Sequence, residues 1–502
     1  MEGLHHRLGS VAGGHPHRIA LVDEPRRIAY GPLWDQARAF AAALQSLGME
    51  PGQRLAIVLP NCIEAVVACY GGWIAGAVVV PLNVQARARD LGQWLSHCGA
   101  AAVACAAVDE DLAQALREMP LAPACLVVDA DAGPSGFRTG ATPIRDSEAA
   151  VPGTALILYT SGTTGDPKGV TLTHANLLAN VAAVIDYLAL SVNDSVLSPL
   201  PFYYAYGASV LHTHLVSGAR VVLARNLLFP HQLMEQACSE RVTGLSGVPS
   251  TYALLLDRVA LGDYDLSSLR YLTQAGGAMP AALAKRLHES IPHARLFLMY
   301  GQTEATSRLT WLPPDRFEQK AGSVGIPVDG TALKIMAEDG SQAGVGEHGE
   351  VWAKGPGVMP GYWKNPEASA SVLQHGWLRT GDLGFLDEDG FLFLLGRRSD
   401  IIKTGAHRVH PNDIEQVIAE LPWVSEVAVV GTHDEMLGQA IKALVVVAPG
   451  AIERADAAIK AHCRTQLAPY KVPRYVEFVD SLPRTASGKV RRTQLMEQKA
   501  KP

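Results

Sequence analysis

The sequence has few of the features that mark metal-binding, redox-active or exported proteins. Its seven cysteines include no Cys-x-x-Cys pair, which argues against a zinc ribbon and against a dithiol redox motif. An odd, scattered set of cysteines is typical of a protein from a reducing compartment. The first residues, Met-Glu-Gly-Leu-His-His-Arg, lack the apolar segment of a signal peptide. We therefore expect no export and a cytoplasmic location.

The chain also lacks an excess of charge of either sign. Lysine and arginine together number 43, aspartate and glutamate number 49, and the formal net charge is -6. This balance gives no electrostatic reason to expect a nucleic-acid partner. The partner that we expect is a small molecule.

Long apolar runs are scarce as well. The run Ala65–Leu82 carries no charge and is long enough to raise the question of a membrane span. Several glycines and Pro81 interrupt it, and no cluster of basic residues flanks it. We therefore expect a buried helix to about Ala75 and a strand at 77–80, with no membrane span.

Two common hydrolase motifs are missing. No Gly-x-Ser-x-Gly occurs, which disfavours a serine hydrolase. His288-Glu289 resembles the start of the zinc motif His-Glu-x-x-His, but the second histidine, His293, comes one residue late. Pro292 would also break the helix that aligns the two histidines. We therefore interpret this segment as the end of a surface helix.

The length and the pattern of elements indicate an α/β protein with more than one domain. A chain of 502 residues exceeds what one hydrophobic core usually holds. Short apolar runs alternate with amphipathic helical segments from residue 18 onward. From residue 345 the pattern changes to short strands separated by glycines, which predicts a small β-rich subdomain. Residues 409–502 indicate a compact α+β unit.

A loop of small and hydroxylated residues runs from Tyr159 to Val170, after the apolar run Ala155–Leu158. Unhindered backbone N–H groups, hydroxyl donors and a lysine are what a phosphate group requires. The P-loop of nucleotidases is excluded, because Pro167 replaces its second glycine and Gly169 follows Lys168 in place of Ser or Thr. The loop is either a phosphate-binding loop or an ordinary Ser/Thr/Gly turn.

Three other segments end in small or polar residues. Residues 272–280 form a predicted strand and a small-residue turn, against which a flat base or an acyl chain could lie. Ligands bind where the strands of an open sheet end. Thr303 and Glu304, after the next predicted strand, are therefore candidate partners for phosphate and Mg²⁺. Asp382 is either an acceptor for ribose hydroxyls or an ordinary turn aspartate before a glycine.

Taken together, these segments resemble the adenylate-forming superfamily of acyl- and aryl-CoA synthetases, amino-acid adenylation domains and luciferases. The resemblance covers residues from about 18 to 495. It rests on five motifs in the order and approximate spacing of that superfamily: Thr160–Lys168, Tyr300–Glu304, Trp377–Asp382, Gly396–Lys403 and Ser487–Lys489.

The resemblance implies a fold with two domains and an active site between them. The large N-terminal domain, residues 1–399, would contain mixed sheets and helices together with the small β-rich subdomain. The smaller α+β domain, residues 400–502, would be mobile and would carry the catalytic lysine, Lys489. Rotation of this domain about Asp400 would serve the two half-reactions in turn.

The activity that the resemblance implies is ATP-dependent ligation of a carboxylic acid to a thiol. ATP and Mg²⁺ would convert a fatty or aryl acid into an acyl-adenylate, and coenzyme A would then take the acyl group. Two alternatives remain: an enzyme that loads an acyl carrier protein, and a catalytically idle binding protein of the same fold. The presence of Lys168, Glu304, Asp382 and Lys489 disfavours the idle protein.

The resemblance also implies individual roles. The catalytic residues would be Lys489, Glu304, Thr163 and Lys168, with Glu304 as the metal ligand. Tyr300 and 276–278 would flank adenine, and Asp382 and Arg397 would hold ribose. The full set expected to bind ATP or AMP is Thr160, Ser161, Gly162, Thr163, Thr164, Gly165, Lys168, Gly276, Gly277, Ala278, Tyr300, Gly301, Thr303, Asp382 and Arg397.

The acyl pocket and the thiol tunnel are implied in the same way. Tyr204, Tyr206 and Gly207 would line the acyl pocket. Gly207 stands where amino-acid adenylation domains carry the aspartate that binds the substrate amine, so an α-amino acid is disfavoured. Gly405 and Ala406 would line the tunnel for the thiol, and Ala406 replaces a glycine that is usual there. No motif specifies which acid is used.

Overall fold

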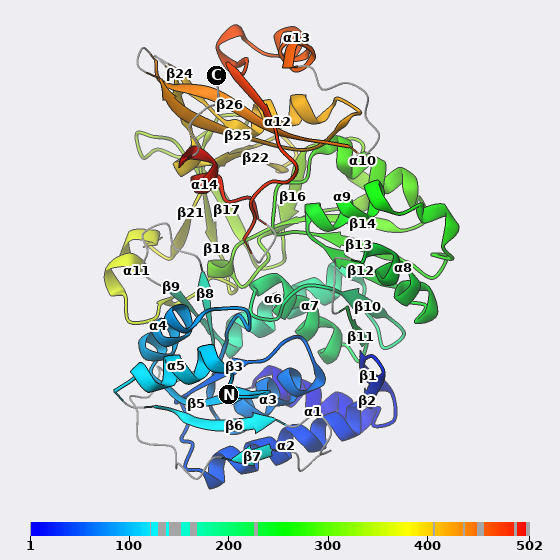
Figure 1. Ribbon diagram of the computed structural model, residues 1–502, viewed down its shortest axis with the longest axis vertical. Coiled ribbons are helices and arrows are strands. Elements are labelled where there is room, and N and C mark those ends of the chain that lie inside the picture. Colours follow the sequence, from blue (N-terminus) through cyan, green and yellow to red (C-terminus); the bar gives the residue numbers. More distant parts are fainter. Residues whose placement is uncertain are drawn as a thin grey trace.

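The computed structural model describes residues 2–120, 122–128, 137–139, 152–160, 168–224, 229–404, 407–434, 437–448, 456–485 and 489–497. In this part of the chain three β-sheets and their covering helices form a mixed α/β structure, with a large N-terminal part and a small C-terminal part (Figure 1). The α/β class expected from the sequence is confirmed.

The largest sheet combines a parallel half with an antiparallel half. Its strand order is β17-β18-β21-β22-β16-β15-β14-β13-β12-β10-β11-β1-β2, with β20 paired to β21. The parallel half and its edge contain β1 (Ile19–Asp23), β2 (Arg26–Ala29), β10 (Ser195–Ser198), β11 (Arg220–Leu223), β12 (Gly244–Gly247), β13 (Tyr271–Gln274) and β14 (Arg295–Tyr300). The antiparallel half contains β15 (Thr310–Leu312), β16 (Ser323–Pro327), β17 (Ala332–Met336), β18 (Gly349–Lys354), β20 (Leu373–Gln374), β21 (Trp377–Leu386) and β22 (Leu392–Arg397). The β-rich region predicted from residue 345 therefore begins earlier and continues this sheet.

The second sheet has the order β19-β9-β8-β4-β3-β5-β6-β7. Its strands are β3 (Arg54–Val58), β4 (Val78–Pro81), β5 (Ala100–Cys105), β6 (Ala124–Val128), β7 (Phe137–Thr139), β8 (Thr154–Thr160), β9 (Lys168–Thr173) and β19 (Gly361–Tyr362). Parallel strands covered on both faces consist mainly of apolar residues. This explains why the charge-free run Ala65–Leu82 lies in the core, partly in β4.

Helices cover both of these sheets. The main core lies between them and includes residues of α1 (Leu4–Gly14), α2 (Tyr30–Ser46), α3 (Ile63–Ile74), α6 (His174–Leu188) and α7 (Ala205–Val216). The other face of the largest sheet packs on α8 (Pro230–Ser239), α9 (Pro249–Arg258) and α10 (Ala281–Ser290). The other face of the second sheet packs on α4 (Ala88–Cys98) and α5 (Glu110–Glu118). Within the described residues, no helix is both long and apolar enough to cross a membrane.

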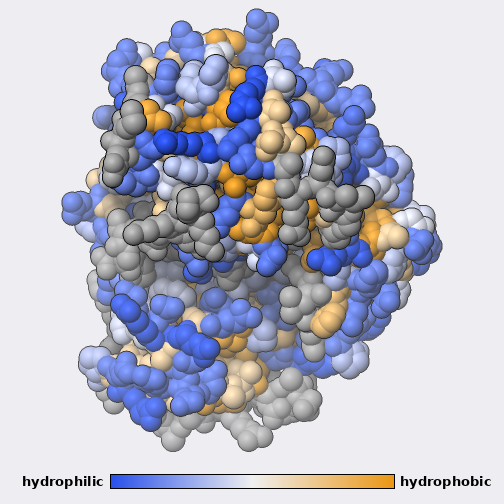
Figure 2. Space-filling model, turned by 45° about the horizontal axis from the view of Figure 1, so that its top comes forward, coloured by the Kyte–Doolittle hydropathy of each residue, from blue (hydrophilic) through white to orange (hydrophobic). Residues whose placement is uncertain are grey.

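The third sheet forms the small C-terminal part, which lies at the end of the molecule opposite α1 and α2 (Figure 1). It contains β23 (Ile402–Thr404), β24 (His407–Val409), β25 (Val424–Asp434), β26 (Gly438–Val447) and β27 (Tyr475–Phe478). The remaining helices are α11 (Pro366–Val372), α12 (Pro411–Ala419), α13 (Asp456–Gln466) and α14 (Arg492–Glu497). The surface shown in Figure 2 is mainly hydrophilic, with apolar residues in smaller patches.

One glycine of α7 is required by close packing of the backbone. A Cβ atom at Gly207 would lie 2.1 Å from the carbonyl oxygen of Pro201. We expect Gly207→Ala to lower the free energy of unfolding by about 1–3 kcal/mol, because the clash forces the backbone to move. Gly13→Ala in α1 is the matched control, since a Cβ there meets nothing within 4 Å. It should stabilise the helix by up to about 1 kcal/mol. Chemical denaturation measures both changes, and equal stabilities would contradict the packing argument.

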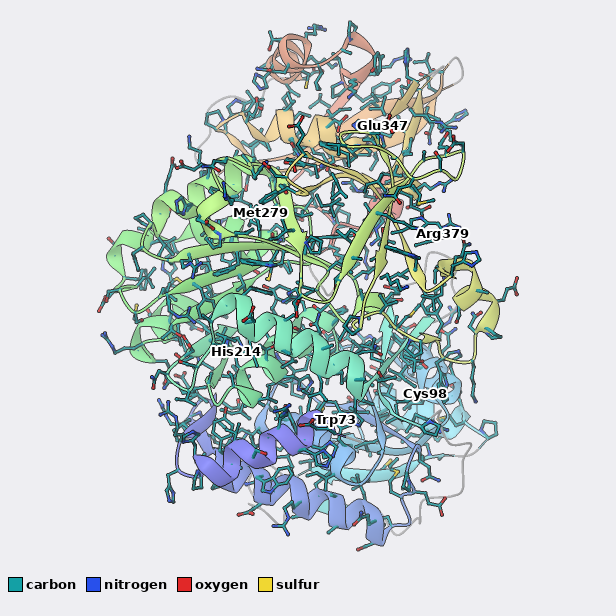
Figure 3. The ribbon with its side chains drawn as sticks, turned by 180° about the vertical axis from the view of Figure 1, so that it is seen from behind. Trp73, Cys98, His214, Met279, Glu347 and Arg379 are labelled. Carbon is teal, nitrogen blue, oxygen red and sulfur yellow. The ribbon has the colours of Figure 1, made fainter. Side chains whose placement is uncertain are left out.

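Two buried histidines of α7 predict how stability depends on pH. Burial lowers the pKa of His212 to about 3 and that of His214 to about 4. Figure 3 labels His214. Its Nδ1 atom lies 2.7 Å from the Val210 carbonyl oxygen, and its Nε2 atom lies 2.7 Å from the Tyr271 hydroxyl. Because Val210 only accepts, Nδ1 carries the proton and Nε2 accepts from Tyr271. The folded protein therefore holds this histidine neutral.

We expect the contribution of these two histidines to the free energy of unfolding to be fully present above pH 6.5 and to fall as the pH is lowered toward 4. In the unfolded chain a histidine binds a proton near pH 6.5, whereas in the folded protein these two residues stay neutral until the pH is much lower. Each histidine contributes up to about 1.4 kcal/mol per pH unit to the slope of the unfolding free energy against pH. The slope of the unfolding free energy between pH 6.5 and 4 measures this. Replacing His212 by glutamine should reduce the slope, and replacing the exposed His15 should not; a flat profile in the unmodified protein would contradict the prediction.

Candidate active site

A cleft of about 1990 Å³ lies between the largest sheet and the C-terminal part. Several segments that are far apart in the sequence line it. They include the ends of β13 and β14, the neighbouring strands β21 and β22, the start of β9, and the segment before α14. The cleft therefore lies where the strands of an open sheet end, which is the usual place for a ligand in such folds.

The two described ends of the glycine-rich loop lie at this cleft. Thr160 ends β8 and Lys168 begins β9, and the two residues are paired across the antiparallel strands. Both line the cleft. The Lys168 ammonium lies 5.6 Å from the centre of the Tyr362 ring. Ser161, Gly162, Thr163, Thr164 and Gly165 lie outside the described residues.

The end of β14 brings a carboxylate to the same place. Thr303 and Glu304 lie in a single 3₁₀ turn, Thr303–Ala305, which begins three residues after Tyr300, the last residue of β14. The hydroxyl of Tyr362 donates a hydrogen bond of 2.9 Å to Glu304 Oε1. Tyr362 thus contacts both Lys168 and Glu304, so the two motifs that lie far apart in the sequence meet around one side chain.

Asp382 is the centre of a second polar cluster. The pairing of β21 with β22 sets it opposite Arg397, and Arg397 Nε lies 3.0 Å from its Oδ1. The hydroxyl of Tyr300 donates a 2.6 Å hydrogen bond to Oδ2, and the Asp382 N–H donates to Thr380 Oγ1. Burial raises the pKa of Asp382, and Arg397 and the Tyr300 hydroxyl oppose that effect. The carboxylate is held in a fixed orientation with an arginine and a phenol.

Lys489 comes to this cluster from the C-terminal part. Its pKa is lowered, first because protein surrounds it and second because Arg397 is close. Asp382 and Glu304 act in the opposite direction. The side chain nevertheless remains exposed to the cleft. Lys489, Arg397 and Lys168 thus present positive charge to the cavity that also contains the carboxylates of Glu304 and Asp382. This arrangement is suited to a polyphosphate with a bound metal ion.

A turn of small residues lies beside these charged groups. Gly276 follows β13 with φ of +84°, a conformation that favours glycine. The Gly277 carbonyl oxygen accepts a 2.9 Å hydrogen bond from the Gln274 side chain. Gly276, Gly277 and Ala278 all line the cleft. Without large side chains, this turn can accommodate a planar group against its backbone.

The three residues expected at the acyl pocket lie in different surroundings. Tyr204 lines the cleft. Tyr206 is buried, and its hydroxyl donates a 2.8 Å hydrogen bond to the Thr273 carbonyl oxygen. Gly207 is enclosed in α7, where the contact with Pro201 gives a steric reason for glycine that does not depend on the substrate.

The connector between the two parts contains an ion pair. Asp400 ends the 3₁₀ turn Arg398–Asp400, and its Oδ2 lies 3.4 Å from Arg492 Nε. Arg492 also pairs with Glu415 at 2.7 Å. The expected hinge residue is thus tied to α14, a few residues beyond Lys489. Gly405 and Ala406 lie outside the described residues.

Sequence reasoning missed the position of Tyr362. Its segment, Gly361-Tyr362-Trp363, predicts a short strand but carries no sign of its neighbours. The position follows from the antiparallel pairing of β19 with β9, in which Tyr362 lies opposite Val170. A single sequence contains no signal for this long-range pairing.

The residues present fit a magnesium ion held together with a nucleotide. Mg²⁺ is usually bound by one or two carboxylates, water and substrate phosphates, and a dedicated cage of protein ligands is unusual. Among the described residues, no group of three His, Cys, Asp or Glu side chains could hold a metal. Glu304 supplies one carboxylate in the cleft, and within the described chain the hydrogen bond that this carboxylate accepts comes from Tyr362.

Comparison with known proteins gives two matching family models. The model of the AMP-binding enzyme matches residues 9–363, and the model of the AMP-binding enzyme C-terminal domain matches residues 413–489. Both ranges include residues of the cleft, since Lys168 and Glu304 lie in the first and Lys489 in the second.

Similar proteins extend over almost the whole chain. A long-chain-fatty-acid–CoA ligase of Bacillus subtilis is 31% identical and covers 98% of this chain and 93% of its own. A 2-succinylbenzoate–CoA ligase of Geobacillus kaustophilus is 34% identical, covering 96% and 95%. The structure of O-succinylbenzoate coenzyme A synthetase from Bacillus subtilis with AMP is similar with a TM-score of 0.83. It is 30% identical and covers 98% of each chain.

Proposed function

The chain belongs to the family of AMP-binding enzymes, and from this premise we infer that it is an AMP-forming acyl-CoA synthetase. It activates a carboxylic acid with ATP as the acyl-adenylate and transfers the acyl group to the thiol of coenzyme A. The observation that supports this function most strongly concerns the cleft. It is lined by four residues from separate segments: Lys168, Glu304, Asp382 and Lys489.

In the first half-reaction a carboxylate oxygen of the acid attacks the α-phosphorus of ATP, and pyrophosphate leaves. Two negatively charged reactants must approach each other, so positive groups at the reacting atoms lower the barrier. We assign Lys489 to the carboxylate and α-phosphate, and Lys168 with the loop 160–165 to the triphosphate. Asp382, held by Arg397 and Tyr300, accepts hydrogen bonds from the ribose hydroxyls. Adenine lies against 276–278.

Magnesium, when bound, neutralises charge on the phosphates and helps the pyrophosphate to leave. We assign its protein ligand to Glu304. The Tyr362 hydroxyl orients this carboxylate through its hydrogen bond to Oε1. Glu304 lines the cleft, where phosphate oxygens would complete the coordination of the ion.

In the second half-reaction the thiolate attacks the acyl carbonyl carbon, and AMP leaves with one oxygen of the original acid. Lys489 lies on the side of the cleft from which the thiol must come. We therefore propose that residues 400–502 rotate as a unit relative to residues 1–399, with Asp400 as the hinge. The division between sheets supports this boundary, because β22 ends at Arg397 and β23 begins at Ile402. Gly405 and Ala406 are the proposed lining of the thiol tunnel.

The proposed substrates are a fatty or aryl acid, ATP and coenzyme A. The cysteines Cys62, Cys69, Cys98, Cys105, Cys125, Cys238 and Cys463 are all free thiols, which supports a reducing compartment such as the cytoplasm. An acyl carrier protein in place of coenzyme A is the other acceptor to test, because its phosphopantetheine arm presents the same thiol.

The experiment is an assay of pyrophosphate, AMP and free thiol across a panel of fatty and aryl acids. We expect one pyrophosphate and one AMP for each thiol lost when coenzyme A is present. A phosphopantetheinylated carrier protein replaces coenzyme A in a parallel reaction. Formation of ADP, or thiol loss that needs no ATP, would contradict the proposed function.

A further inference from the structure

Arg308 is a buried arginine that the proposed reaction does not use. Its exposed fraction is 3%. Its guanidinium carbon lies 4.3 Å from the centre of the Tyr206 ring, its Nε lies 3.3 Å from Met299 Sδ, and a terminal nitrogen donates to Ser307 Oγ. Within the described residues no carboxylate pairs with it. An arginine is rarely buried without an anionic partner, because removing its charge from water is costly.

A buried hydroxyl without a partner in the described part of the chain lies at the same void as Arg308. A small void of about 10 Å³ is lined by Arg308, Thr213, Ser246 and Thr273, among others. The Thr213 hydroxyl is fully buried and has no hydrogen-bond partner among the described residues. A hydroxyl and a guanidinium that face one void offer several donors and no negative charge. This combination suits a ligand that brings acceptor oxygens.

The void lies directly behind the wall of the cleft. Met299 lines both spaces. The Tyr206 ring separates them, because one of its carbons lies 3.8 Å from the position of a Cβ on Gly276, while Arg308 packs on the ring. Gln274 lines the cleft and its neighbour Thr273 lines the void. An acid that extends from Lys489 past Gly276 therefore points toward Tyr206 and Arg308.

Unfavourable backbone geometry turns Arg308 inward. Thr306 and Ser307 have φ of 55° and 96°, values that residues with a side chain rarely adopt. Both residues are buried, directly after the 3₁₀ turn that contains Glu304. The Thr306 hydroxyl bonds the Gly357 carbonyl oxygen at 2.6 Å and holds the bend. Backbone strain of this kind is concentrated at ligand sites.

We propose that Arg308 binds a second carboxylate at the far end of the acid, so that the substrates are dicarboxylic acids. The inference rests on the proposed function, because it needs the first carboxylate to react near Lys489. The planar guanidinium pairs with a carboxylate through two hydrogen bonds, and the Thr213 hydroxyl supplies another donor. The Tyr206 ring moves aside to admit the chain, and until then it faces the cation.

The test compares kcat/KM for straight-chain dicarboxylic acids of six to ten carbons with that for the monocarboxylic acids of the same lengths. We expect kcat/KM of the unmodified enzyme to be about 10–10²-fold higher for the diacid than for the monoacid, which is the effect expected of hydrogen bonds to a charged group. A preference should appear at one chain length, because Arg308 and Lys489 hold the two ends.

Arg308→Met keeps a similar volume and removes the charge. We expect it to lose the preference for diacids and to use the monoacids at least as well, with KM for ATP unchanged. Arg295→Met is the matched control, since Arg295 also lies over an aromatic ring, at 5.3 Å from Phe297, but is exposed outside the cleft. It should leave the preference unchanged.

Each result decides the proposal. An unmodified enzyme that prefers monoacids at every length would overturn it without any variant. A diacid preference that Arg308→Met leaves intact would show that the arginine only packs on Tyr206, and would overturn it as well. If no acid of either series releases pyrophosphate, while other acids also fail, then the proposed function itself is wrong and the inference falls with it.

Discussion

Replacing Lys489 by alanine is expected to slow adenylate formation by about 10²–10³-fold, the usual effect of removing one preorganised charge from a transition state. Lys489 is a cation that the C-terminal part brings into the cleft, where burial lowers its pKa and the charges of Asp382 and Glu304 oppose that effect. Lys489 plays no part in the reaction after the acyl-adenylate has formed. Thioester formation from a supplied acyl-adenylate should therefore stay within a few-fold of the original rate.

Two assays on one preparation measure this difference. ATP–pyrophosphate exchange reports the first half-reaction, and loss of coenzyme A thiol with synthetic acyl-adenylate reports the second. Lys354→Ala is the control, because Lys354 is an exposed lysine at the end of β18, outside the cleft. Equal loss of both half-reactions in a folded Lys489→Ala protein would refute the assigned role.

Asp400→Pro is expected to separate the half-reactions in the opposite direction. Proline holds φ near -65° and removes a backbone donor, so it should fix the connector in one orientation. Lys489 already lies in the cleft in the present orientation. ATP–pyrophosphate exchange should therefore persist, while thioester formation falls by at least about 10²-fold because the reacting groups are displaced.

A second variant separates the backbone effect from the ion pair. Asp400→Ala removes the carboxylate that lies 3.4 Å from Arg492 but leaves φ free to change. It should weaken the present orientation without preventing rotation, so thioester formation should be retained. If the proline variant loses both activities equally at an unchanged melting temperature, rotation about Asp400 is not the mechanism.

The fold was predictable to the extent that it depends on local pattern. The run Ala65–Leu82 shows this, because its apolar residues and glycines predicted the buried helix and strand that α3 and β4 form. The continuity of the β-rich region with the largest sheet was not predictable. It depends on the pairing of β16 with β22 and of β15 with β14, and no local signal specifies which strands become neighbours.

The candidate site was also predictable only in part. The sequence predicted Lys168, Glu304, Asp382 and Lys489 through motifs that resemble those of the adenylate-forming superfamily, and all four line the cleft. Their assigned roles remain predictions. Tyr362 and Arg308 could not be identified in this way. An isolated tyrosine or arginine looks the same in a sequence whether it is solvated or buried, and only the packing around Glu304 and Tyr206 distinguishes the two cases.

The most direct test of the proposed chemistry follows the oxygen atoms of the acid. An acid labelled with ¹⁸O in its carboxylate is incubated with the enzyme, ATP, Mg²⁺ and coenzyme A, and the products are analysed by mass spectrometry. Attack of the carboxylate on the α-phosphorus predicts that AMP carries one labelled oxygen and that pyrophosphate carries none. Unlabelled AMP, or label in inorganic phosphate beside ADP, would contradict an acyl-adenylate intermediate.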